Sequence, residues 1–306
     1  MTADRSRAAR DAIVTAPGDR RDVVVQTIRQ ARERLVLSLY RCNDQAIFDE
    51  LKQARERGVQ VDVLVTSRSG GGRKRLRKLW RALEETGISL HPHTDPVVKY
   101  HAKYLVADDG PALIASLNFT RKCFAKTIDA IVVTHDPEVV SGLRSLLTAD
   151  RGHEPMPERL SPRLIVGPET ARRQFTSIIA QASSSVRLID RKASDPALMS
   201  LLQTRASQGV RVELYDGKRL CGLRSHGKIM LVDDRLAVVG GLSLHGHARM
   251  RLRPYPHRKG ERTALKIDLM PRSAYVLRGP ARWNWQHSIS PTTELRYSIT
   301  LRTLGG

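Results

Sequence analysis

The sequence predicts an α/β fold in which one structural unit is used twice. Strand-like and helix-like segments alternate along the chain, which is typical of layered sheets with helices on their faces. The two halves also align with each other without a gap over a long stretch. With 306 residues, of which 41% are hydrophobic, the chain is long enough for two packed cores. We therefore expect two similar α/β domains.

The repeat appears at an offset of 151 residues. Identical pairs at this offset include Gln30 and Gln181, Ala31 and Ala182, Asp44 and Asp195, Leu51 and Leu202, Gly58 and Gly209, and Val61 and Val212. Each copy begins with an amphipathic segment, over 23–33 and 172–182, followed by an apolar strand, over 35–40 and 186–190. A helix over 46–57 and 196–208 comes next, ends at a Gly, and leads into a second strand over 59–65 and 210–216.

The first copy then carries an insertion over 67–93 that the second lacks, and the offset falls to 125. Within it Leu76, Leu79, Trp80 and Leu83 recur at helical spacing, and the other positions of 73–81 hold Arg or Lys. This pattern predicts an amphipathic helix with a cationic face. That face either contacts phosphates or is an ordinary solvated surface. Three glycines precede the helix without a following GK[ST], which argues against a nucleotide P-loop.

Both copies next contain a His, a Lys two residues later, and an Asp five residues beyond the Lys. These residues are His101, Lys103 and Asp108 in the first copy, and His226, Lys228 and Asp233 in the second. Residues i and i+2 of a strand point to one face, so we expect each His and Lys to project together. Such a set suits phosphoryl transfer without a metal. One neutral imidazole attacks phosphorus, a second protonates the leaving oxygen, and two ammonium groups neutralise the phosphate.

These two motifs resemble the phospholipase D superfamily, whose signature is HxKxxxxD followed by a Gly-Ser-x-Asn stretch. The resemblance covers about residues 20 to 244. It implies two subdomains, each a mixed sheet flanked by helices, related by a pseudo-two-fold axis. It also implies a phosphohistidine intermediate resolved by water or an alcohol, with no metal or other cofactor.

Carried over to this chain, the resemblance implies His101 as the nucleophile and His226 as the general acid, with the exchanged roles left open. Lys103 and Lys228 would hold the phosphate, helped by Ser116 and Asn118. Asp108 and Asp233 would support the fold rather than the chemistry.

Asp129 stands eleven positions after Asn118, where the family commonly has an acidic residue that orients a catalytic His. It is either that positioning residue or a solvated Asp at a strand edge. The second copy departs from the pattern, because Gly240, Gly241 and Ser243 replace Ala115, Ser116 and Asn118, and Pro254 replaces Asp129. Ser243 could still donate to a phosphate oxygen. We therefore expect the second set of supporting residues to be weakened.

The net charge of +21 predicts polyanionic partners: nucleic acid, an anionic membrane surface, or phosphorylated substrates. The three cysteines, Cys42, Cys123 and Cys221, have no metal-like or disulfide-scaffold spacing. No export signal or membrane-spanning stretch is evident, so a cytoplasmic location, with at most peripheral membrane contact, is expected. Because both motifs lie in one chain, a monomer is expected.

The expected domain boundaries are a polar N-terminal arm over 1–20, a first domain over 21–155, a second, incomplete domain over 156–244, and a basic segment over 245–306. That last segment holds twelve Lys or Arg against three acids, and it has no counterpart of the strand and closing helix that end the first copy. It is either a basic extension that binds a polyanion or the product of an altered reading frame. We expect poor order there, because 245–262 has high charge and few residues able to pack.

The leading functional hypothesis is a phosphodiesterase of the phospholipase D type that hydrolyses a phospholipid or transfers its phosphatidyl group. A nuclease using the same histidines is the alternative within this chemistry, favoured by the charge. A non-catalytic polyanion-binding protein with a decayed second half is the alternative from another class. Because both His-x-Lys pairs are present, this third hypothesis is the weakest.

Overall fold

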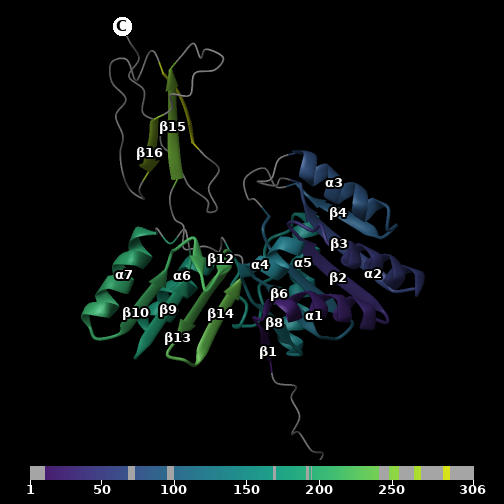
Figure 1. Cartoon of the computed structure of the whole chain (residues 1–306), viewed down its shortest axis with the longest axis horizontal. Coiled ribbons are helices and arrows are strands. Elements are labelled where there is room, and N and C mark those ends of the chain that lie inside the picture. The colour runs from purple at the N-terminus through teal and green to yellow at the C-terminus, as the bar shows by residue number, and fades with distance from the viewer. Residues whose placement is uncertain are drawn as a thin grey trace, which may run out of the picture.

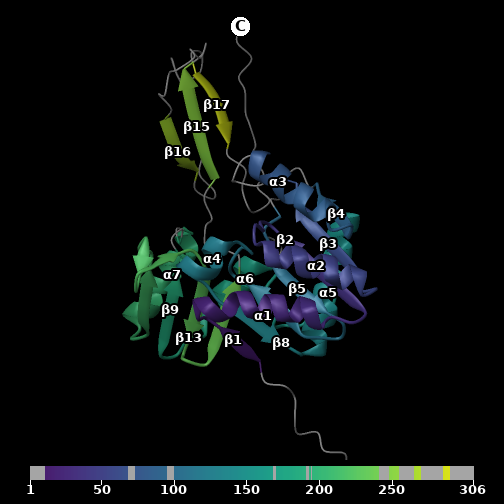
Figure 2. The ribbon, with the colours of Figure 1, turned by 45° about the vertical axis from the view of Figure 1, so that its right-hand side comes forward.

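The computed structural model describes residues 11–67, 73–94, 100–167, 170–190, 193, 195–240, 248–254, 265–269 and 285–289. Two α/β halves lie side by side, and a small third sheet stands apart from both (Figures 1 and 2). Each half contains a mixed sheet with helices packed on it, which confirms the predicted fold class.

The first half has a seven-stranded sheet in the order β1-β8-β6-β5-β2-β3-β4. Its strands are β1 (Ala12–Val14), β2 (Arg34–Leu39), β3 (Gln60–Thr66), β4 (Ser89–His93), β5 (Tyr104–Ala107), β6 (Ala112–Ala115) and β8 (Ile131–Thr134). Its helices are α1 (Pro17–Gln30), α2 (Gln45–Glu56), α3 (Arg73–Glu84), α4 (Arg121–Lys126) and α5 (Pro137–Gly152). The three strands β2, β3 and β4 are parallel, and the other pairs are antiparallel.

Alternation along β2 and β3 divides the first core into two layers. Leu35, Leu37 and Leu39 pack with α1, α2 and α3 on one face of the sheet. Val36 and Leu64 face the opposite way and pack with α5. Both faces of this sheet are therefore covered, as period-two alternation between two apolar layers requires.

The second half has a four-stranded sheet in the order β10-β9-β13-β14. Its elements are α6 (Ala171–Ala180), β9 (Ser185–Ile189), α7 (Pro196–Ser207), β10 (Arg211–Tyr215), β13 (Lys228–Val232) and β14 (Leu236–Gly240). The order and directions of these four strands repeat those of β3, β2, β5 and β6. The predicted duplication is thus present in the topology.

Local contacts repeat as well. In each half an aspartate caps the helix that follows β2 or β9. Asp44 caps the N-terminus of α2, and Asp195 caps the N-terminus of α7. Each also pairs with an arginine of the preceding helix, Arg21 and Arg172 respectively. A capping Asp typically stabilises a helix by about 1 kcal/mol. One local solution has therefore been used in both copies.

One face of the second sheet lacks a helix among the described residues. Val186 and Leu188 of β9 pack under α6 and α7. On the opposite face Arg187 forms ion pairs with Glu213, at 3.7 Å, and with Asp234, at 2.7 Å. The register places half-buried Leu231 beside Arg187, and half-buried Ile229 beside Ile189, on the same face. This face therefore carries both ion pairs and partly exposed apolar side chains.

The two halves join through short strands that cross the repeat. β7 (Thr127–Ile128) of the first half pairs in parallel with β12 (Leu223–Ser225) of the second, and β12 pairs with β11 (Arg219–Leu220). The backbone N–H of Gly227 also donates to the carbonyl of Ile128 at 2.9 Å. These contacts bring the second His-x-Lys motif next to the residues that follow β6.

Both ends of the chain differ from the expected boundaries. Residues from Ala12 onward are not a polar arm, because β1 pairs with β8 and α1 already begins at Pro17. Residues 245–306 include β15 (Ala248–Pro254), β16 (Leu265–Leu269) and β17 (Trp285–Ile289), which form an antiparallel sheet in the order β16-β15-β17. These strands form without apolar periodicity, because ladder hydrogen bonds satisfy their backbone groups. For 245–306 as a whole, poor order or divergence stays a prediction. Alternation of apolar and polar residues over 294–302 predicts one further strand, which lies outside the described residues.

The helix expected in the insertion is α3, and β4 follows it. Leu79 and Leu83 are buried, whereas the Arg and Lys residues of its first three turns are exposed. The amphipathic prediction is confirmed. Within the described part of the chain, no helix combines the length and apolarity needed to span a bilayer.

Candidate active site

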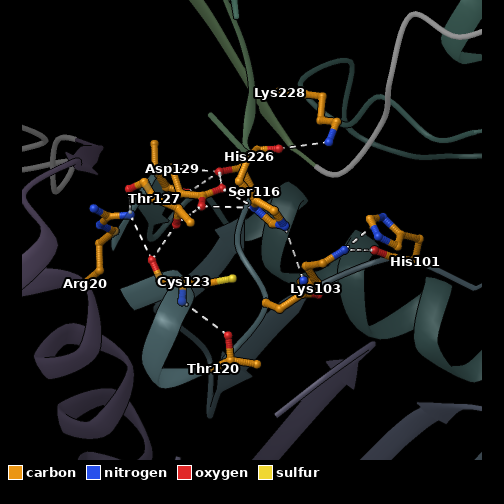
Figure 3. A network of polar contacts seen from close by, with 12 residues as sticks. Arg20, His101, Lys103, Ser116, Thr120, Cys123, Thr127, Asp129, His226 and Lys228 are labelled. Carbon is orange, nitrogen blue, oxygen red and sulfur yellow. Dashed lines mark hydrogen bonds and ion pairs between the residues drawn. The ribbon is translucent and has the colours of Figure 1, made fainter. Parts of the chain in front are cut away.

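The two His-x-Lys segments lie at the junction of the halves, immediately before or at the start of a strand. His101 and Lys103 precede β5, and β13 begins at Lys228, two residues after His226. Each lysine folds back onto its own histidine, since Nζ of Lys103 and Nζ of Lys228 donate to the carbonyls of His101 and His226. Figure 3 shows these side chains gathered in one region. The structure thus brings together the four residues expected to act on the phosphate.

Lys103 is the most enclosed charged group of this set. It is 4% exposed, lies over the ring of Tyr40 at 5.1 Å, and places Nζ 2.9 Å from Nδ1 of His101. Burial, and then the positive charge of Lys228, hold the pKa of the Lys103 ammonium well below its usual range. A bound anion such as a phosphate would therefore stabilise the charged form of Lys103.

Ser116 and Asn118 follow β6 on a turn fixed by its backbone. The N–H of Ser116 donates to the carbonyl of Ala130, and its hydroxyl donates to Oδ1 of Asp129 at 2.7 Å. Nδ2 of Asn118 lies 3.4 Å from Nε2 of His226. The segment after β6 in the first half therefore supports the histidine of the second half.

Asp129 is buried and contacts His226, so it is not a solvated Asp at a strand edge. It is 2% exposed, and both of its carboxylate oxygens lie 3.1 Å from Nδ1 of His226. The hydroxyls of Ser116 and Thr127 donate to the same carboxylate, which orients it. The contact crosses the repeat, from the first half to the second.

A buried arginine lies beneath this carboxylate. Arg20 of α1 is fully buried and donates to the carbonyls of Cys123, at 3.3 Å, and Thr127, at 2.9 Å. Burial lowers the pKa of its guanidinium, whereas the negative charge of Asp129 raises it. Arg20 thus balances the buried charge of Asp129 and ties the residues around it to α1 (Figure 3). No motif in the sequence marks Arg20, because it belongs to an ordinary helical pattern far from the His-x-Lys segments.

Gly227, between the motif His and Lys of the second half, makes a close approach. A Cβ at this position would lie 2.8 Å from Oδ1 of Asp129, 2.8 Å from Oγ of Ser116 and 2.9 Å from the carbonyl oxygen of Ile128. Such distances are shorter than any ordinary contact. The first half has Ala102 at the equivalent position. Only a glycine lets the Asp129–His226 contact form without displacing its neighbours.

The two motif aspartates hold the fold, as the family resemblance implied. Asp108 accepts from the backbone N–H groups of residues 32, 33 and 34, and Asp233 accepts from those of residues 183, 184 and 185. These hydrogen bonds lower the pKa of Asp233. For Asp108, partial burial acts in the opposite direction, but the hydrogen bonds still lower its pKa. Both aspartates lie at the end of their sheet that is remote from the histidines.

One group of possible metal ligands occurs among the described residues. Cys123, Asp129 and His226 each offer one ligand atom, and these atoms lie within 4.8 Å of one another. The sequence spacing gave no sign of this group. The carboxylate of Asp129 already accepts from Ser116, Thr127 and His226, and the Arg20 guanidinium interacts with it electrostatically. Both oxygens of the Asp129 carboxylate are therefore already used as hydrogen-bond acceptors.

The second half was expected to have a weakened set of supporting residues. Gly240, at the end of β14, has no side chain to offer, and Ser243 lies outside the described residues. Pro254, the counterpart of Asp129, lies in β15 of the separate sheet. A proline cannot supply a carboxylate, so the second half provides no copy of the Asp129 contact at this position. The site is asymmetric although the fold is duplicated.

The first half of the chain is similar in sequence to known proteins. Residues 24–151 match the family described as cardiolipin synthase, PLD-like domain. Over 136 residues the chain is 29% identical to a phospholipase D of Rickettsia bellii (strain RML369-C), which covers 44% of this chain and 65% of that protein. The first half of the chain is thus similar to proteins of the phospholipase D superfamily. It spans slightly less than two thirds of the Rickettsia protein.

Solved structures extend the similarity of fold into the second half. A polyphosphate kinase from Porphyromonas gingivalis matches 77% of this chain and 46% of its own, with a TM-score of 0.59 and 18% identity. A phosphatidylserine synthase from Haemophilus influenzae Rd KW20 matches 68% of this chain and 61% of its own, with a TM-score of 0.51 and 14% identity. At these identities the likeness concerns the fold alone.

Proposed function

We propose that this protein is a metal-independent phosphodiesterase that acts through a covalent phosphohistidine. The observation that carries the proposal is the hydrogen bond between Asp129 and Nδ1 of His226. An ionised carboxylate only accepts hydrogen bonds, so Nδ1 of His226 must carry the proton. In the neutral ring Nε2 then holds a lone pair, and Nδ2 of Asn118 lies on that side as a donor. This arrangement suits a nucleophile.

His101 has the opposite tautomer. Its Nδ1 lies 2.9 Å from Nζ of Lys103. Where Lys103 is an ammonium it can only donate, so Nδ1 accepts and the neutral ring carries its proton on Nε2; an imidazolium ring carries a proton on Nε2 as well. His101 is therefore suited to protonate a leaving oxygen. This geometry favours His226 as nucleophile and His101 as general acid, the exchange of the roles first expected from the sequence.

The reaction follows in two steps. Nε2 of His226 forms a bond to phosphorus, the bond from phosphorus to the leaving oxygen breaks, and that oxygen takes the Nε2 proton of the His101 imidazolium, which becomes neutral. Water or an alcohol then attacks phosphorus and gives its proton to His101, and the bond to His226 breaks. Lys103 and Lys228 neutralise the non-bridging oxygens throughout. Both histidines end in their starting states.

The chemistry accommodates two substrate classes. A phospholipid, hydrolysed or used to transfer its phosphatidyl group to an alcohol, is supported by the family of the first half and by the Rickettsia phospholipase D. A nucleic acid is supported by the net charge of +21. A non-catalytic polyanion-binding role is the weakest candidate, because both His-x-Lys pairs share one network of polar contacts.

Trapping the intermediate tests both the reaction and the roles. Bis(p-nitrophenyl) phosphate has a leaving group that departs without protonation, so His101→Ala should still complete the first step. We expect this variant to release p-nitrophenol in a single burst and to retain a phosphoryl adduct on His226, detected by mass spectrometry. His226→Ala should give neither. An adduct on His101 instead would reverse the roles, and no hydrolysis by the unaltered protein would refute the proposed function.

A further inference from the structure

We propose that α3 binds the phosphate backbone of a nucleic-acid strand and guides that strand into the active site. This inference rests on the proposed function and names its substrate class. It starts from six exposed cationic side chains of α3: Arg73, Lys74, Arg75, Arg77, Lys78 and Arg81. Neutralising several phosphates at once is the main source of affinity for a nucleic-acid backbone.

The cations form a stripe rather than a ring. At 100° per residue, positions 73, 74, 77, 78 and 81 fall on one side of the helix, opposite Leu79 and Leu83. From Arg73 to Arg81 the stripe extends for about 12 Å. Of its members only Arg81 has an ion pair within the described residues, with the exposed Glu85 at 3.3 Å. The stripe is therefore available to an external anion.

The opposite face fixes the helix in place. Leu79 and Leu83 are 4% and 0% exposed, and Trp80 packs against the same core as β2 and β3. Burying a leucine side chain typically contributes about 2 kcal/mol. The cationic stripe is thus presented by a packed element of the fold. A rigid stripe loses less conformational entropy on binding than a flexible basic tail.

The topology places the start of α3 at the end of the sheet near which the histidines lie. β2 and β3 are parallel, with Leu39 paired to Val65, so Tyr40 and Thr66 follow at the same end. The ring of His101 lies 4.4 Å from that of Tyr40. α3 connects β3 to the parallel strand β4, so it begins at the end of the sheet where β3 ends. A nucleic-acid strand bound along α3 would therefore extend from the end of the sheet at which His101 lies.

The apolar surface argues against a membrane as the partner of α3. A helix that lies on a bilayer inserts its apolar face, but the apolar face of α3 is packed into the protein core. The large hydrophobic residues exposed among those described are Ile13, Tyr215 and Leu236, none of them on α3. Leu236 pairs with Val232, at the opposite end of β13 from Lys228. The charge of α3 thus acts without an apolar anchor, as a backbone-binding surface does.

Salt-dependent binding tests this inference. The probe is a fluorescein-labelled single-stranded oligodeoxynucleotide, and the full chain carries His226→Ala so that the strand is not cut. Anisotropy titrations between about 50 and 200 mM KCl give the slope of log affinity against log salt. The combined change Arg73→Glu, Lys74→Glu and Arg77→Glu should weaken binding by more than about 10-fold at low salt and reduce the slope by about 2.

A matched variant separates position from net charge. Arg32→Glu, Lys52→Glu and Arg55→Glu change the same number of charges, and all three residues are exposed near the opposite edge of the sheet. We expect this variant to bind as the parent does. Equal weakening in both variants would show an effect of net charge alone, and no weakening in either would show that α3 is not used. Each result would overturn the inference.

A second probe distinguishes the other partner. Vesicles containing phosphatidylglycerol should bind the α3 variant and the control variant equally. If the α3 substitutions abolish vesicle binding and leave oligonucleotide binding unchanged, the inference is wrong and α3 binds a membrane. Hydrolysis of bis(p-nitrophenyl) phosphate by the unaltered protein is measured separately, so failure of the proposed chemistry and failure of this surface are distinguishable.

Discussion

Asp129 in the first half of the chain accepts a hydrogen bond from Nδ1 of His226 in the second half, with 3.1 Å from the nitrogen to each carboxylate oxygen. The pair spans 97 residues and joins the two copies of the repeat. It sets the tautomer of His226, and the reactivity of His226 therefore depends on a residue outside its own domain. The two halves cannot be separated without loss of the site.

Replacing this carboxylate by an amide should impair catalysis more than folding. In Asp129→Asn the side chain can donate as well as accept, so Nε2 of His226 is no longer held free of its proton. We expect kcat to fall by about two to four orders of magnitude, with a smaller change in KM. Steady-state kinetics and burst amplitudes measure this. Asp109→Asn is the matched control, because Asp109 is a fully exposed neighbour of a motif residue.

Adding one methyl group beside this pair should also reduce activity. In Gly227→Ala the new Cβ meets two groups at 2.8 Å, Oδ1 of Asp129 and Oγ of Ser116, and neither can move freely because both are buried and hydrogen-bonded. Overpacking of this kind costs about 1–3 kcal/mol. We expect a lower thermal unfolding midpoint together with slower turnover. The control is Ala102→Gly, at the equivalent position of the first half; if Gly227→Ala retained full activity, the close approach would be unimportant.

The repeated parts of the fold could be predicted from the sequence because each is encoded locally. Apolar periodicity and glycine helix ends revealed α2, α7 and the strands beside them, and the insertion gave α3. The cross-repeat contacts could not be found this way. Whether Asp129 faces His101 or His226 depends on how two separately folded halves meet, and no local pattern records that. Arg20 was missed for the same reason.

The ends of the chain show a different limit. β1 has three residues and is held by its pairing with β8, about 120 residues away, so its own sequence carries little strand signal. In 245–306 charged residues such as Arg249 and Arg251 interrupt apolar periodicity, yet their backbones pair with β16. Backbone hydrogen bonds form whatever the side chain is, so the composition of a segment does not reveal whether its backbone pairs in a sheet.

Substrate binding should draw a proton into the site. The pKa of Lys103 is held well below its usual range, first by burial and then by Lys228, and a bound phosphate diester raises it by adding a negative charge. Affinity for diethyl phosphate, which remains a monoanion, should therefore decrease as pH rises through the pKa of Lys103. Calorimetry in two buffers of different ionisation enthalpy should show proton uptake. Lys103→Met should bind without it; proton release in the unaltered protein would contradict the assignment.

Turnover should survive chelators. In the proposed mechanism Lys103 and Lys228 provide the positive charge that a metal ion supplies in metal-dependent phosphodiesterases. Asp129, the carboxylate of the one possible ligand group described, is already committed to Ser116, Thr127 and His226. We expect the rate after dialysis against EDTA to equal that before it. Activity that is lost on dialysis and restored by a divalent ion would refute the metal-independent mechanism.

Asp233 should make the stability of the second half depend on acid. Hydrogen bonds from the backbone N–H groups of Ser183, Ser184 and Ser185 hold its pKa below the value of about 3.9 expected in an unfolded chain. Below that value the unfolded state binds the proton first, so the stabilisation is present above about pH 4 and is lost as pH falls through the pKa of the folded state.

Urea unfolding followed by circular dichroism at a series of acidic pH values measures this effect. In Asp233→Asn the midpoint should be lower at neutral pH and should fall less steeply between about pH 5 and 2, because the titrating group is gone. Asp234→Asn is the control, since Asp234 bonds the side chain of Arg187. It should keep the steep acid dependence of the unaltered protein. If Asp233→Asn kept the same acid slope, the backbone hydrogen bonds to this carboxylate would not be the source of the acid sensitivity.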